Sequence, residues 1–88
     1  MKKLVNVVEV EGEGLAALLG ENVLLFCANY IYHGTLTGVN STCILLEDAS
    51  IVYETGELCA NTFKDAQKLP NQHYIQISAI ESFGISGR

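Results

Sequence analysis

Hydrophobic and polar residues alternate along much of the chain after residue 20, which is the pattern of half-buried β-strands. In the first such segment Val23, Leu25 and Cys27 share a face, and in the next Leu36 lies on the same face as Gly34. Short turn-forming segments separate these runs. The pattern predicts closely connected antiparallel strands over residues 21–27, 31–39, 43–54, 73–78 and 79–85.

Three segments depart from this alternation. Residues 15–20 (LAALLG) combine good helix formers with a closing glycine and predict a short N-terminal α-helix. Residues 55–72 are polar, contain the only proline and predict an irregular stretch. Residues 4–10 (LVNVVEV) are rich in valine and are a candidate for an additional edge strand.

The length and the strand spacing favour one small domain with a bent sheet. The chain is expected to form a single domain over 1–88, with an N-terminal extension over 1–14 and a core over 15–83. Five strands in about 65 residues fit a small, strongly bent open barrel better than a flat sandwich. Because an inward-facing glycine lets a strand bend sharply, we expect the second strand to fold over the core at Gly34. The predicted fold class is therefore mainly β.

Composition narrows the class of protein. Hydrophobic residues make up 49% of the chain, more than a lone small domain usually hides, which indicates a buried interface between subunits. The formal net charge of −5 opposes broad binding to a phosphate backbone. A signal peptide is not expected, because Asn6, Glu9 and Glu11 interrupt the N-terminal apolar run and no small-residue cleavage site follows. A membrane partner is not expected either, because no apolar stretch approaches the roughly 18 residues of a membrane span. The three cysteines, Cys27, Cys43 and Cys59, form no CxxC pair, which favours a reducing cytoplasm.

The residue types that carry catalysis or bind metals do not occur in a suitable pattern. His33 and His73 lie in predicted strands beside tyrosines, without further ligands at a metal-binding spacing. A triad of Ser41 with His33 and an acid lacks the nucleophile elbow and oxyanion loop that such a site needs. Cys43 has no basic neighbour in sequence that would make it a reactive thiol. We expect no catalytic residue, no cofactor and no metal.

The chain resembles the Sm and Sm-like (LSm) family as a divergent member. Gly20 closes the predicted helix and is followed, at the spacing of the first Sm motif, by apolar residues, a turn and the aromatic Tyr32. The G-x-L-x-G run then occupies residues 34–38, and residues 44–48 (ILLED) match the closing LxLED-type run. Residues 75–83 (IQISAIESF) align with the second motif, IRGxxIxxI, through hydrophobic positions. The resemblance implies a short N-terminal helix followed by a strongly bent five-stranded sheet.

The resemblance also implies that the chains assemble into a ring. In the family, the fourth strand of one subunit pairs with the fifth strand of the next, and these strands correspond here to residues 73–78 and 79–85. Both segments are apolar and lack the proline or lysine residues that protect exposed strand edges. We therefore expect a cyclic homo-oligomer of about five to seven subunits.

Family members bind single-stranded RNA, commonly uridines, at the inner rim of the ring. An aromatic residue stacks on the base, an asparagine bonds its edge, and an Arg-Gly pair closes the pocket. Here Ser41 stands at the stacking position, Cys43 at the asparagine position, and Gln76 with Ile77 in place of Arg-Gly. The RNA-contacting residues that the resemblance implies are Asn40, Ser41, Thr42, Cys43, Gln76 and Ser78.

Two functions remain open at this point. The first is a non-catalytic Sm-like ring that binds single-stranded RNA or acts in RNA metabolism through an altered nucleotide pocket. The second is an acidic ring that serves as a protein-interaction scaffold without RNA. The family resemblance favours the first function, whereas the altered pocket and the negative charge favour the second.

Overall fold

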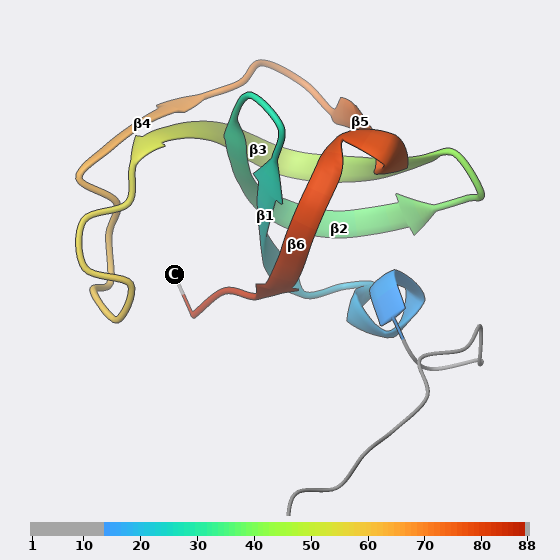
Figure 1. Cartoon of the computed structure of the whole chain (residues 1–88), viewed down its shortest axis with the longest axis horizontal. Helices are drawn as coiled ribbons and strands as arrows, with labels where there is room; N and C mark the ends of the chain where they lie inside the picture. The colour runs from blue at the N-terminus through green and yellow to red at the C-terminus, as the bar shows by residue number, and fades with distance from the viewer. Residues whose placement is uncertain (1–13, 88) are drawn as a thin grey trace, which may run out of the picture.

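The structure is a computed structural model that describes residues 14–87 of the chain (Figure 1). The candidate edge strand over residues 4–10 lies outside the described residues. Six strands and two short 3-10 helices make up the described fold. They are η1 (Gly14–Leu18), β1 (Asn22–Cys27), β2 (Ile31–Val39), β3 (Cys43–Glu54), β4 (Asp65–Lys68), β5 (His73–Gln76), η2 (Ile77–Ala79) and β6 (Ile80–Ile85).

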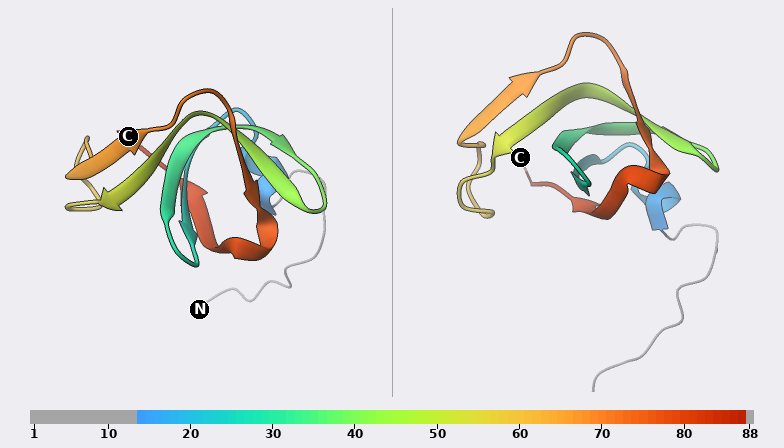
Figure 2. Two further views of the ribbon diagram at one scale, coloured as in Figure 1. Left: turned by 90° about the horizontal axis from the view of Figure 1, so that it is seen from above. Right: turned by 45° about the horizontal axis from the view of Figure 1, so that its top comes forward.

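All six strands belong to one antiparallel sheet that curls strongly and stays open (Figure 2). The strand order is β4-β3-β2-β1-β6, and β5 also pairs with β3. β4 and β5 lie along opposite halves of β3, since Ser50 pairs with Lys68 and Leu46 pairs with His73. Together they form one interrupted edge strand. The sheet therefore ends with β6 on one side and with β4 and β5 on the other.

The first three predicted strands are confirmed almost residue for residue, but the number of strands is wrong. Residues 65–68, expected to be irregular, form β4. All four of its residues are exposed, so the strand carries no buried face and no alternating pattern that could reveal it. The predicted strand over 73–78 ends at Gln76, because the next three residues form η2.

In place of the predicted N-terminal α-helix the structure has the 3-10 helix η1. Five residues allow little more than one turn, and the tighter 3-10 geometry is common in such short pieces. The helix ends at Leu18 and a turn follows over residues 19–20, where the φ of Gly20 is +87°. The Gly20 N–H then donates to the carbonyl oxygen of Leu36 at 2.7 Å, and the Leu36 N–H donates to that of Glu21 at 3.0 Å. These bonds fix the segment to β2.

The core lies inside the curl of the sheet. Its residues are those that the alternation places on the inner faces of β1, β2, β3 and β5. The buried hydrophobic residues of this core are Val23, Leu25, Leu36, Ile44, Leu46, Ala49 and Ile75. Val52 is also buried, but its pairing with Ile31 places it on the other face of β3. No helix within residues 14–87 has the length and apolar character that crossing a membrane requires.

Gly34 lies where β2 and β3 bend together. Two residues of β3, Asp48 and Ala49, face this single residue of β2, which makes a β-bulge. A Cβ atom on Gly34 would lie 3.0 Å from the Glu47 carbonyl oxygen and 3.1 Å from the Ala49 Cα. Only glycine permits so close an approach of the two backbones without a shift.

Candidate nucleic-acid interface

The β2–β3 turn and the segment after β5 lie side by side. Cys43 pairs with Gln76 in the β3–β5 register, and the Ile77 N–H donates to the Thr42 carbonyl oxygen at 2.9 Å. The structure therefore brings together the two groups of predicted RNA-contacting residues, which are far apart in sequence. We call this surface, formed by residues 40–43 and 76–78, the rim.

Asn40 holds the turn of the rim in place. Its Oδ1 atom accepts hydrogen bonds from the backbone N–H groups of Thr42 and Cys43, both at 2.8 Å, and from the Thr42 hydroxyl at 3.2 Å. The Asn40 N–H donates to the Cys43 carbonyl oxygen at 3.0 Å. This is the local bonding by which asparagine stabilises tight turns. The side-chain oxygen Oδ1 of Asn40 thus stabilises the turn, a role that sequence reasoning did not foresee.

The other predicted contacts offer neutral polar groups. Ser41, Thr42, Gln76 and Ser78 are exposed, and Cys43 is half-buried. Hydroxyl and amide groups can both donate and accept hydrogen bonds, as the edges of nucleobases require. No aromatic or basic side chain belongs to the rim.

Sequence reasoning missed Tyr74, which lies next to the rim. Tyr74 pairs with Leu45 and is 66% exposed, and together with Asn40 and Cys43 it lines a shallow groove of about 240 Å³. The groove lies on the outer face of the sheet, opposite the core. The available signal was the alternation in β5, which places Tyr74 on the face opposite the buried Ile75.

The described lysines lie away from the rim and form ion pairs. Lys64 Nζ is 3.3 Å from Glu54 Oε2, and Lys68 Nζ is 3.4 Å from Asp48 Oδ1. Lys68 lies in β4 and Lys64 directly before it. Their partners lie in β3, Glu54 at its end and Asp48 at its middle. Within residues 14–87, the rim therefore receives no positive charge from a nearby lysine.

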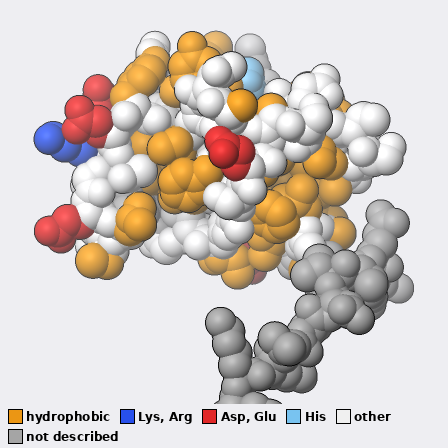
Figure 3. Space-filling view, in the orientation of Figure 1, with side chains coloured by type: hydrophobic (Ala, Val, Ile, Leu, Met, Phe, Trp, Pro, Cys, Tyr) orange, Lys and Arg blue, Asp and Glu red, His pale blue; other side chains and the backbone are white. Residues whose placement is uncertain are grey.

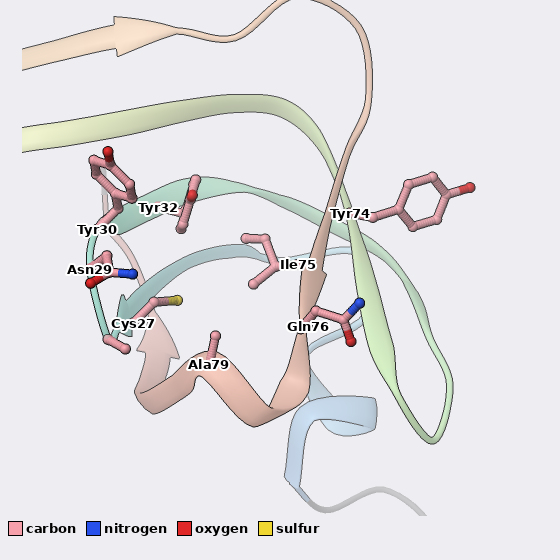
Figure 4. A pocket seen from close by; sticks show the side chains of 9 residues that line it. Cys27, Asn29, Tyr30, Tyr32, Tyr74, Ile75, Gln76 and Ala79 are labelled. Atoms are coloured by element: carbon pink, nitrogen blue, oxygen red, sulfur yellow. The ribbon is translucent and has the colours of Figure 1, made fainter.

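A separate pocket of about 170 Å³ opens between the β1–β2 turn and β5, which we call the mouth pocket (Figure 4). The side chains of Cys27, Ile75 and Ala79 point into it. Those of Tyr74 and Gln76 point away from it, although both residues contribute to its wall.

Two polar groups that line the mouth pocket are partly shielded from water. Burial, with a smaller contribution from the charge of Glu81, raises the pKa of the Cys27 thiol. Burial also raises the pKa of Tyr32, with the Cys27 and Tyr30 charges adding to it. The Tyr32 ring stacks on the His73 ring, with the ring centroids 5.5 Å apart. His73 therefore packs within the fold.

Comparison with known proteins does not assign a family. No protein-family model matches the chain, and no curated protein matches it. The function is therefore inferred from the sequence pattern and from the contacts described above.

Proposed function

We propose that the protein is a subunit of an Sm-like ring, assembled by pairing of the β5 edge of one copy with the β6 edge of the next. The observation that carries this proposal is the exposure of core-face side chains on β6. Phe83 pairs with Leu25, and Ile85 pairs with Val23, so both lie on the same face as fully buried residues. Nevertheless, Phe83 is 42% exposed and Ile85 is 64% exposed. The described part of the chain thus leaves the core face of β6 partly uncovered.

The two ends of the sheet differ, which favours a head-to-tail contact. β5 pairs with β3 on one side, and β6 pairs with β1 on one side, so each leaves its other backbone edge open in the described sheet. Figure 3 shows apolar side chains gathered over the middle of the face on which β6 lies. Open apolar edges favour pairing with another chain, and an unlike contact repeated by rotation closes into a ring.

For the ligand of this ring we propose single-stranded RNA bound at the rim. The exposed hydroxyl and amide groups of Ser41, Thr42 and Gln76 suit the edges of bases. Tyr74 supplies an exposed aromatic ring beside them, on which a base can stack. Edge hydrogen bonds combined with stacking are the usual means of holding single-stranded RNA.

The second candidate function is a ring that binds other proteins and not RNA. It is favoured by the charge of −5 per chain and by the ion pairs that hold Lys64 and Lys68. Phosphate contacts supply most of the non-specific affinity for nucleic acid, and an acidic surface weakens them.

Two measurements test these proposals. Size-exclusion chromatography with light scattering should show a closed oligomer, and a monomer at micromolar concentration would contradict the ring. Fluorescence anisotropy with labelled oligo-U, oligo-A and a mixed RNA at low salt then tests the ligand. We expect Gln76→Ala and Tyr74→Ala each to weaken RNA binding about tenfold, the effect of one lost hydrogen bond or stacking contact.

The exposed Leu58 lies in the loop between β3 and β4, so Leu58→Ala is a matched control that should bind like the parent chain. Absence of saturable binding below roughly 100 μM, weaker than typical non-specific affinity, would favour the scaffold. Binding that neither Gln76→Ala nor Tyr74→Ala changes would place the RNA site away from the rim.

A further inference from the structure

The mouth pocket has the size and the lining of a site for one aromatic ring. Its volume is about 170 Å³, and an engineered apolar cavity of about 150 Å³ is known to hold benzene. The Ile75 side chain forms one wall, and the Ala79 methyl group points up from the opposite side (Figure 4). Tyr32 adds an aromatic surface.

The pocket lies on the core side of β5, beside the open edge of that strand. Ile75 pairs with the buried Ile44, so it marks the core face of β5. A strand added at this edge continues the sheet, and its side chains alternate between the same two faces. If the added strand is β6, its core-face residues lie next to Ile75 and therefore next to the pocket.

Phe83 is the aromatic residue on the core face of β6. It lies within the strand, two residues before its end at Ile85, and is 42% exposed because the sheet of its own chain ends there. Its phenyl ring matches the volume of the pocket, whereas the polar groups of the rim lie on the other face of β5. The exposed side chain and the empty space thus lie at opposite ends of the same sheet.

We propose that Phe83 of one copy enters the mouth pocket of the next copy, between Cys27, Tyr32, Ile75 and Ala79. This inference rests on the proposed ring and specifies which side chain joins each pair of subunits. The contact is head-to-tail, because each copy contributes Phe83 at one end of its sheet and the pocket at the other. Each subunit therefore uses its Phe83 once and its mouth pocket once when the ring closes.

Complementary variants test the contact. Phe83→Asp removes the aromatic ring but keeps the pocket, and Ala79→Glu fills the pocket but keeps Phe83. We expect each variant alone to lose about 30-fold or more in association, as for truncated hot-spot residues. An equimolar mixture should form a 1:1 dimer in native mass spectrometry. The dimer should not grow, because its remaining interface would place two carboxylates together.

Circular dichroism of each variant establishes that the chain is folded. Disulfide cross-linking is a second test, and it does not depend on weakening the contact. In a Cys59→Ala chain, Phe83→Cys places a thiol beside Cys27 of the next copy. Diamide takes up the two thiol hydrogens and should produce a ladder of disulfide-linked chains on a non-reducing gel. Adding Cys27→Ser should abolish the ladder.

The possible outcomes separate this inference from the proposed ring. If the parent chain is a monomer, the ring itself is contradicted. If the parent chain forms a ring but the mixed variants form no dimer and the cysteine pair forms no ladder, the ring stands and the Phe83 contact is wrong. Rings that persist in both single variants would show that the pocket is open to another occupant, such as a small aromatic ligand, and would also overturn the proposal.

Discussion

Replacing Gly34 by alanine tests the close approach of β2 and β3 at the bend of the sheet. The added Cβ would meet the Glu47 carbonyl oxygen at 3.0 Å, the Ala49 Cα at 3.1 Å and the Leu46 Cβ at 3.3 Å. Two of these atoms belong to the backbone and cannot rotate away, so the strands themselves must separate. Overpacking of this kind costs about 1–3 kcal/mol. The reduced freedom of the unfolded alanine chain offsets about 0.4–1 kcal/mol where alanine fits without strain.

We therefore expect Gly34→Ala to lower the free energy of unfolding by about 2 kcal/mol. For a domain of this size that corresponds to a fall in Tm of about 8–16 °C, measured by circular dichroism at fixed protein concentration. Gly38→Ala is the matched control in the same strand. There the added Cβ meets only the Leu45 side chain, at 3.4 Å, and Gly38 does not have a positive φ. Equal losses of Tm in the two variants would refute the argument from close backbone contact.

Two further substitutions test the mouth pocket and the rim. Burial and the charge of Glu81 raise the pKa of the Cys27 thiol above its ordinary value of 9.0. As the pH rises above about 9, the unfolded chain therefore loses this proton before the folded chain does. The contribution of Cys27 to the free energy of unfolding is complete below about pH 9 and falls as the pH rises further. Thermal unfolding should show a steeper loss of Tm above about pH 9 in the parent than in Cys27→Ala. The control Cys59→Ala should behave like the parent. Parallel curves of Tm against pH for all three chains would contradict the raised pKa of Cys27. Asn40→Ala should cost about 1 kcal/mol and about 4–8 °C in Tm, because two backbone donors lose their acceptor. Asn40→Asp keeps the acceptor oxygen and should retain most of the stability, so a loss as large as that of alanine would argue against this role.

The strands that bury one face could be predicted from the sequence, because burial produces the alternating pattern. β2 and β3 have the predicted bounds, and β1 begins one residue later than expected. β4 could not be found in this way, since its four residues are all exposed and its place is set by pairing with β3. The leucine-rich segment 15–20 has helical composition, but composition does not fix the type of so short a helix.

The candidate site was only partly visible in the sequence. The motif spacing located the two rim segments, and the β3–β5 register brings them together. The spacing gave no sign that Asn40 Oδ1 is used to hold the turn, because that role depends on hydrogen-bond geometry. The alternation indicates which face Tyr74 occupies, whereas the face of Phe83 follows from its pairing with Leu25 after a β-bulge. Their exposure depends on where the sheet ends, which is a property of strand pairing and not of local sequence.

The high hydrophobic content of the chain has a definite location in the structure. A core of seven buried hydrophobic residues within residues 14–87 accounts for only part of it, and Phe83 and Ile85 extend the same face to the open end of the sheet. Gly34 permits the close approach of β2 and β3 at the bend, and the strongly curled sheet stays open (Figure 2). Within residues 14–87 the sheet stays open and leaves the core face of β6 partly uncovered, and the head-to-tail contact that we propose would cover it with the β5 edge of another copy. Bending at a glycine and an uncovered core face on β6 are thus two features of one short, strongly curved sheet.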